Sequence, residues 1–510
     1  MTLQNQCPPR PEFGSAGRPR LSLLLASAAF LLATEAAGAG SIRDTVQATL
    51  DSNPEIGIVK TNRHAVDQEL RQARAGYYPS LDARAAAGPE YTRFSGDRRR
   101  ASLGDDNGDS DTLLRKEAQL TLSQMLFDGF ETRSEVERQT ARVSSASYRV
   151  QETAEFTALD AVEAHLEVLR YQEIVKLSDT NLAQIERYLT QVRDLERGGR
   201  ADSSDVEQTL ARLSQAKASL ASSRGSLADA IATYEQIVGE RPANLLLETP
   251  PIAALAGGAE DAALQASVTN PTVLIAASDV DVAEAELRGT RANYLPRLDA
   301  ELSASASDDV NGVQGENVGA SALLVMRYNL FRGGADIARE REAFQRVNQS
   351  RIEVQRARRK AEEEARMSYN ALETARARAV ALRDEAEAQR RTRDAYAGQF
   401  ELGLRELLDV LDAENQLYAA RVALTTAEFT DRFAVYRNLA VVGTLLDTLD
   451  VTRPREVISI YRAPNDIQTP AAVRDKSREL AEPRAEPRPL RGAKAGEPPV
   501  DALDAAKVVR

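Results

Sequence analysis

The stretch GLRELLDVLDAENQL, residues 403–417, follows the pattern of an earlier stretch, GRADSSDVEQTL, residues 199–210. Both begin with glycine, and both place an aspartate six residues later. Three pairs of anchors recur at a separation of 204 residues: Phe127 and Phe331, Gly199 and Gly403, and Asp205 and Asp409. Two further pairs recur at 217 residues: Asn53 and Asn270, and Pro79 and Pro296. Because the anchors keep one order, we interpret the chain as two copies of a unit of about 200 residues.

The first 39 residues are typical of a signal peptide for export. Two arginines precede an apolar run at 21–33, and Ala37 and Ala39 offer a small-residue cleavage site. The single cysteine, Cys7, would be removed with this segment, so the mature chain is expected to have no disulfide. The full chain has 510 residues and a net charge of -12, which disfavours nucleic acid as a partner.

The repeat divides the rest of the chain. The first copy covers 40–239, residues 240–261 connect the copies, and the second copy covers 262–452. Each copy is expected to contain a helix, a β-hairpin and a long helical hairpin. The expected helices are 41–76 and 262–293, the β-hairpins 79–127 and 296–331, and the helical hairpins 130–238 and 333–447. Residues 453–510 are rich in Pro, Arg, Ala and Glu without a period, which predicts a disordered tail.

The residues after Pro296 alternate strictly between apolar and polar side chains, which predicts a strand with one apolar and one polar face. The apolar positions are Leu298, Ala300, Leu302, Ala304 and Ala306. Four such strands are too few to close a barrel, since about eight make the smallest filled barrel. Because lipid does not tolerate exposed strand edges, a membrane location would require several chains to close one barrel.

Aromatic residues gather where the expected strands meet the helices. An aromatic girdle at a membrane interface has this placement, and packing at helix–strand junctions is the alternative. The residues are Tyr77, Tyr78, Phe127, Phe130, Tyr294, Tyr328 and Phe331.

The helical hairpins contain segments of about 65 residues, which corresponds to about 100 Å of helix. Apolar side chains of the segment 130–197 form two stripes. One stripe suits a two-stranded coiled coil, whereas two stripes suit a helix with neighbours on both sides, as in a wall of helices. The expected fold is therefore mainly α-helical, with long hairpins that form a tube and a small β part.

The signal peptide, the doubled unit and the two kinds of hairpin together resemble the TolC family of outer-membrane channel proteins. The most specific match is G-x-R-x-x-x-D-V-L-D-A at 403–413, which is similar to the family's inner hairpin turn. The stretches ERGGRADSSDVEQ and AVEAHLEVLRYQEIV look more like the type I protein-secretion branch, which includes adhesin exporters, than the drug-efflux branch.

The resemblance implies a homotrimer in the outer membrane of a Gram-negative cell. Three chains would form a twelve-stranded β-barrel in contact with outer-membrane lipid and a twelve-helix α-barrel across the periplasm. The implied partners are a periplasmic adaptor protein, an inner-membrane transporter, commonly of the ABC type, and an exported protein. Efflux of drugs or other small molecules is the alternative function.

The resemblance also assigns roles to residues at the two hairpin turns, which Gly199 and Gly403 begin. Arg405 matches an arginine that ties hairpin tips together, with Ser204 and Asp205 as its acceptors. Asp409 and Asp412 match two aspartates that ring the closed entrance. In a trimer they become six carboxylates, which would select cations and raise one another's pKa by repulsion. A family tyrosine near this turn corresponds to Phe400, so its hydrogen bond would be missing.

Two other classes of protein explain the sequence less well. An enzyme is disfavoured because the chain has two histidines, far apart, and no motif of a nucleophile, phosphate loop or metal site. We therefore expect no catalytic residues, no metal and no cofactor. A periplasmic coiled-coil adaptor or scaffold would explain the helices and the signal peptide, but not the strands or the doubled unit.

Overall fold

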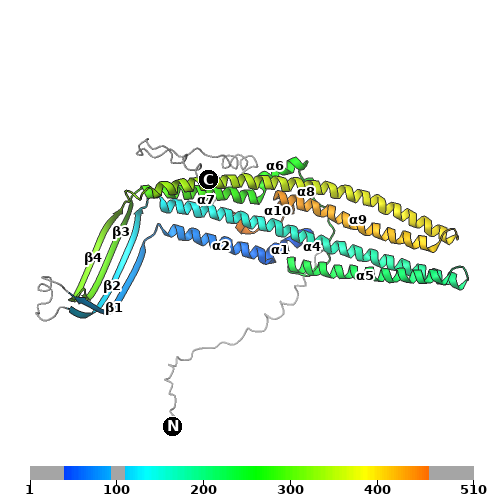
Figure 1. The fold of residues 1–510 in the computed structure, drawn as a ribbon, viewed down its shortest axis with the longest axis horizontal. Helices are drawn as coiled ribbons and strands as arrows, with labels where there is room; N and C mark the ends of the chain where they lie inside the picture. Colours follow the sequence, from blue (N-terminus) through cyan, green and yellow to red (C-terminus); the bar gives the residue numbers. More distant parts are fainter. Residues whose placement is uncertain (1–39, 94–109, 459–510) are drawn as a thin grey trace, which may run out of the picture.

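The computed structural model describes residues 40–93 and 110–458. The expected signal peptide at 1–39 and residues 459–510 of the expected tail lie outside the described residues. The molecule is elongated, with a β-sheet at one end and long helices that run from it to the opposite tip (Figure 1). Among the described helices, none is both long and apolar enough to cross a membrane.

The elements follow the expected order in each copy. The first copy contains α1 (Ile42–Ser52), α2 (Pro54–Ala75), β1 (Ser80–Arg93), β2 (Ser110–Phe127), α4 (Glu131–Arg197) and α5 (Ser203–Val238). The second contains α6 (Ala259–Thr269), α7 (Pro271–Thr290), β3 (Arg297–Val310), β4 (Val313–Arg327), α8 (Ala335–Glu401), α9 (Leu407–Val442) and α10 (Leu445–Thr448). Short 3₁₀ turns lie at Ile252–Ala254, Arg291–Tyr294 and Arg455–Val457.

The four strands form one antiparallel sheet in the order β1-β2-β3-β4. Ala304 lies opposite Leu120 and Ala320, whereas its neighbour Ser303 lies opposite Thr121 and Ser321. Paired residues of neighbouring strands share a face, so the apolar positions of all four strands gather on one side. This confirms the predicted amphipathic strands. β1 and β4 each pair with one described strand, which leaves two edges of the sheet open.

The long helices form a curved wall. α4 and α8 have 67 residues each and run the whole length of the helical part. α2 and α7 pack on α4 in the half nearest the sheet, and α5 and α9 pack on it in the far half (Figure 1). The two apolar stripes of α4 therefore have a partner on each side, as expected. α8 buries one stripe against α6, α7 and α9, so it lies at an edge of the wall.

One expectation about the helices was wrong. The single helix expected over 41–76 is broken at Asn53, and the one expected over 262–293 is broken at Asn270. Each asparagine caps the helix that follows it. Its side chain also binds the end of a returning helix: Nδ2 of Asn53 donates to the Ile237 carbonyl of α5 at 3.0 Å, and Nδ2 of Asn270 donates to the Val441 carbonyl of α9 at 2.8 Å. The same cap in both copies shows that the repeat is structural.

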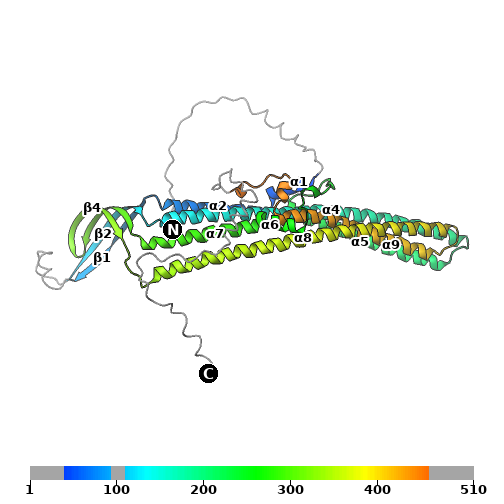
Figure 2. The ribbon, with the colours of Figure 1, turned by 90° about the horizontal axis from the view of Figure 1, so that it is seen from above.

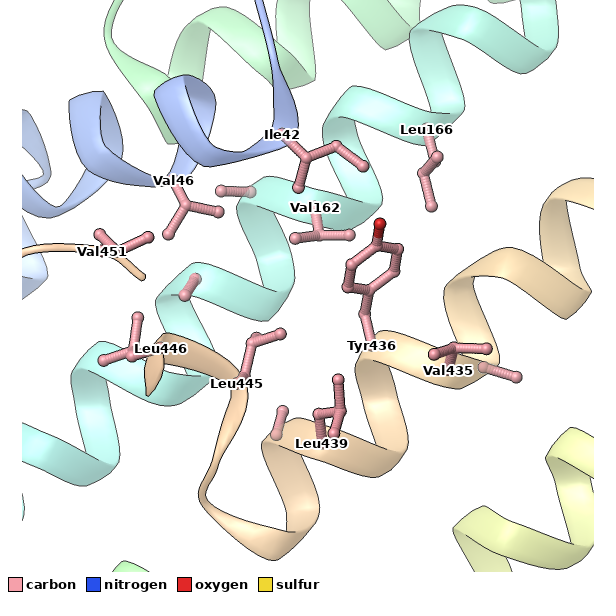
Figure 3. Packing of buried hydrophobic residues seen from close by; sticks show 14 of the residues in the cluster. Ile42, Val46, Val162, Leu166, Val435, Tyr436, Leu439, Leu445, Leu446 and Val451 are labelled. Carbon is pink, nitrogen blue, oxygen red and sulfur yellow. The ribbon is translucent and has the colours of Figure 1, made fainter. Parts of the chain in front are cut away.

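The core at the middle of the molecule joins α1, α4, α9 and α10 (Figure 3). Tyr436 of α9 points into it between Val162 and Leu166 of α4. A carboxylate is buried at its margin: Glu155 of α4 is 1% exposed, and its Oε2 accepts from the backbone amide of Leu445 at 3.1 Å. Figure 2 shows that α1 stands on one side of the helical wall.

Residues 453–458, which were expected to belong to a disordered tail, are part of the packed structure. Val451 and Pro454 are buried, Arg453 pairs with Asp447 at 2.5 Å, and Glu456 lies 3.2 Å from His64 of α2. The reason is that the short turn at Arg455–Val457 packs on α4, a contact that composition alone does not predict.

Two truncations should show that residues 453–458 stabilise the protein and that residues 459–510 do not. Removal of 459–510 should leave assembly and thermal stability unchanged, whereas removal from Arg453 onward should lower the melting temperature, because it deletes the contacts to Asp447 and His64. The melting temperatures of the two truncated proteins in detergent check this expectation. Equal melting temperatures would show that 453–458 contributes nothing.

Candidate functional site: the tip of the helical hairpins

Both hairpin turns depend on a glycine in the left-handed region. Gly199 has φ +71° and Gly403 has φ +74°. The residue after each glycine donates its backbone amide back to the helix, from Arg200 to Leu195 at 2.8 Å and from Leu404 to Gln399 at 2.9 Å. A side chain at either glycine would be strained by this φ, so the two turns need glycine for their backbone conformation.

A small apolar core holds the two hairpins together near the tip. Val192 of α4 and Leu213 of α5 pack with Val410 and Leu411 of α9. Val410 and Leu411 are fully buried. The aspartates on either side of this dipeptide, Asp409 and Asp412, are each 48% exposed, so they flank the core at the protein surface.

Arg405 is engaged within its own hairpin. Its Nη1 lies 3.1 Å from Oδ2 of Asp409, its Nε donates to Oε1 of Gln399 at 2.8 Å, and its guanidinium stacks over the Tyr396 ring at 3.9 Å. Within one chain it is not paired with its expected acceptors. Ser204 is exposed, and Asp205 accepts the backbone amide of Asp202 at 3.3 Å, as the capping box of α5.

Asp412 has a partner that sequence reasoning missed. Nη2 of Arg212, on α5, lies 2.5 Å from its Oδ1. The predicted acidic ring would therefore carry an arginine beside each copy of Asp412. No local spacing identifies Arg212, because the contact joins two helices that are 200 residues apart in the chain.

A second missed pair lies inside the tip. Nη1 of Arg393, on α8, lies 2.7 Å from Oε2 of Glu414, on α9, and both side chains are largely buried. Tyr188 of α4 lies beside this pair, and burial raises the pKa of Tyr188. The pair therefore ties α8 to α9 next to a side chain from the other hairpin.

The expected interface aromatics lie at the junction of the sheet and the helices, with unequal exposure. Phe331 and Tyr78 are the most exposed, at 82% and 73%. The rings of Phe127 and Phe130 meet edge to face at 5.5 Å, whereas Tyr294 donates its hydroxyl to Glu340 at 3.2 Å. Tyr77 and Tyr328 are about half exposed. Most of the set therefore remains available to an interface, and Tyr294 is used inside the chain.

His165 has a structural role in the middle of the molecule. It is fully buried, and its ring nitrogens lie 2.9 Å from Oγ1 of Thr45 and 3.0 Å from the Leu246 carbonyl. Burial lowers the pKa of His165. Within residues 40–93 and 110–458, no group of three or more His, Cys, Asp or Glu side chains is arranged to hold a metal ion.

Comparison with known proteins identifies the family. The model of the family described as outer membrane efflux protein matches residues 45–240 and 263–430. The chain therefore belongs to this family, and the resemblance to TolC channels is confirmed. It is an outer-membrane channel protein that extends into the periplasm, and its family is one of transport proteins.

Three relatives match most of the chain. The outer membrane efflux protein BepC of Brucella suis is 27% identical over 427 residues, covering 82% of this chain and 90% of the relative. The alkaline protease secretion protein AprF of Pseudomonas aeruginosa is 26% identical, covering 85% and 90%. The outer membrane protein TolC of Escherichia coli is 23% identical, covering 77% and 80%.

Solved structures have the same fold. The structure of CusC, described in terms of folding and transmembrane channel formation, matches with a TM-score of 0.67 at 15% identity, covering 79% of this chain and 91% of that one. The expected fold, with a long helical part and a small β part, is thus confirmed.

Proposed function

We propose that three copies of the chain close one continuous tube through the outer membrane and the periplasm. The observation that carries this proposal is the four-stranded sheet, which has an apolar face and an open edge at each end, β1 and β4. Three such sheets joined edge to edge give twelve strands, and closure removes every edge from lipid. The helical wall has matching open edges, α8 on one side and α2 with α5 on the other.

The tips of the helical hairpins form the gate of this tube. In the trimer, Asp409 and Asp412 supply six carboxylates around the axis, and such a ring favours cations. In the closed state Arg405 turns from Asp409 to Ser204 and Asp205 of a neighbouring hairpin, a charged hydrogen bond of about 1.5–3 kcal/mol when partly buried. Phe400 stands where the family has a tyrosine, so the contact of Arg405 is not supplemented by a hydrogen bond from a tyrosine hydroxyl.

The exported material is a protein, passed from an inner-membrane ABC transporter through a periplasmic adaptor. AprF, whose name describes protease secretion, supports this assignment. The name of BepC, an outer membrane efflux protein, supports small-molecule efflux as the second candidate. Residues 1–39 act as the signal that sends the chain out of the cytoplasm.

A deletion strain separates the two candidates. If the channel serves protein secretion, loss of the gene should remove one or more proteins from the culture medium without changing the accumulation of fluorescent dyes. Mass spectrometry of the medium and a dye-accumulation assay measure the two effects. Increased dye accumulation with an unchanged set of secreted proteins would favour efflux instead.

Variants at the tip should test the contribution of Arg405 to closure and the contribution of the two aspartates to selectivity. Arg405→Ser should raise the resting conductance of the purified channel in planar bilayers, because the contact between hairpins is lost. The double variant Asp409→Asn with Asp412→Asn should lose cation selectivity and block by multivalent cations. If the double variant keeps both properties, the two aspartates are only a solvated helix face.

A further inference from the structure

Arg212 of α5 and Asp412 of α9 form an ion pair between the two helical hairpins. Nη2 of Arg212 lies 2.5 Å from Oδ1 of Asp412, and its Nη1 donates to Oε1 of Gln215 at 3.2 Å. Gln215 follows one turn later on the same helix, so α5 itself holds the guanidinium in place. The side chains of Arg212 and Asp412 are 32% and 48% exposed.

The internal repeat restricts this pair to one kind of boundary. At the separation of 204 residues, Arg212 corresponds to Gln416 and Asp412 corresponds to Gln208. In the proposed trimer, the repeat relates the contact between α5 and α9 of one chain to a contact between α9 and the α5 of a neighbouring chain. The boundary within a chain then carries the ion pair, and the boundary between chains carries two glutamines.

The packing shows which contacts must break when the tip widens. α4 packs along α5, and α8 packs along α9, so each hairpin behaves as one body. Between the hairpins, α4 packs on α9, and α5 meets α9 only near the tip, in the small core that includes Val192, Leu213 and Leu411. A wider tip requires the hairpins to part at this boundary, because separation within a hairpin would break a much longer contact.

We propose that the Arg212–Asp412 pair is a lock, within each chain, that holds the two hairpins together and keeps the gate closed. This inference rests on the proposed gate function and adds Arg212 to it as a positioning residue. The lock supplies a bond between hairpins at a turn where Phe400 cannot make one through a hydroxyl group. It also places a positive charge beside the acidic ring, so Asp412 serves both closure and selectivity.

Single-channel recordings of the full-length mature protein in planar bilayers test the lock. Arg212→Gln should raise the ratio of open to closed time by about fivefold for one chain, and on the order of a hundredfold when three chains open together. Cation selectivity should persist, because Asp409 and Asp412 remain. The exchange Arg212→Asp with Asp412→Arg should restore closure, which a merely structural role of Arg212 would not explain.

Arg224→Gln is the matched control. Arg224 lies on the same helix and pairs with Asp179 at 3.2 Å, but this pair stays within the first hairpin, so gating should not change. The proposed role of the Arg212–Asp412 pair would be wrong if Arg212→Gln gated like Arg224→Gln, or if the charge exchange left the channel open. Neither result would contradict the assignment of the protein as a channel. A wild-type protein without any conductance would overturn the channel and the lock together.

Discussion

Ala304→Arg should abolish the insertion of the protein into the outer membrane, whereas Ser305→Arg should be tolerated. Both residues are exposed on β3, but Ala304 lies on the apolar face of the sheet and Ser305 on the polar face. An arginine that faces lipid near the bilayer centre costs about 2–4 kcal/mol, and a trimer would bear this cost three times. An arginine that faces the interior of the barrel meets water instead.

The adjacent positions make a close comparison, because both side chains are small and belong to one strand. Membrane fractionation and the yield of heat-modifiable trimer on gels measure the effect. Equal yields for the two variants would contradict the assignment of the apolar face to lipid. If only the Ser305→Arg variant failed to form trimer in the membrane, the sheet would be inserted with the opposite face outward.

Glu155→Gln should stabilise the protein above neutral pH. Burial raises the pKa of Glu155 from 4.5 to about 7, so the folded protein holds a proton there that the unfolded chain releases. The cost of the buried charge is absent below about pH 4.5 and grows as the pH rises towards 7. Glutamine carries no charge, and its carbonyl can still accept from the amides of Leu445 and Leu446.

The expected gain at pH 8 is at most about 3 kcal/mol per chain, and it should shrink to nothing near pH 4.5. Thermal unfolding of detergent-solubilised protein across this pH range measures it. Glu186→Gln, an exposed position on the same helix, should show no such dependence. A loss of stability for Glu155→Gln at pH 8 would show that Arg453 and the two amides compensate the charge fully.

The architecture could be predicted because it is encoded in local and repeated patterns. The observed bounds of α4 and α5 coincide with the expected hairpin to within a residue, since glycines mark the turn and an apolar stripe marks each helix. The alternation after Pro296 likewise predicts β3 and its apolar face. The broken helices were also visible in principle, because each Asn-Pro pair supplies a cap and a proline at the first helical position.

The site was predicted less completely, because its contacts join distant elements. The positions of Asp409 and Asp412 followed from a motif, but their partners did not. Arg212 and Arg393 are two of many arginines on charged helices, and only tertiary packing selects them. Glu155 presents the same difficulty, since nothing in its surrounding helix indicates that α10 covers it.

The mass of the purified mature protein in mild detergent, measured by light scattering with the detergent contribution subtracted, tests the central claim most directly. The sheet has two open edges and too few strands to close alone, so the account predicts particles of three chains. A monodisperse single chain that stays in aqueous buffer without detergent would contradict it.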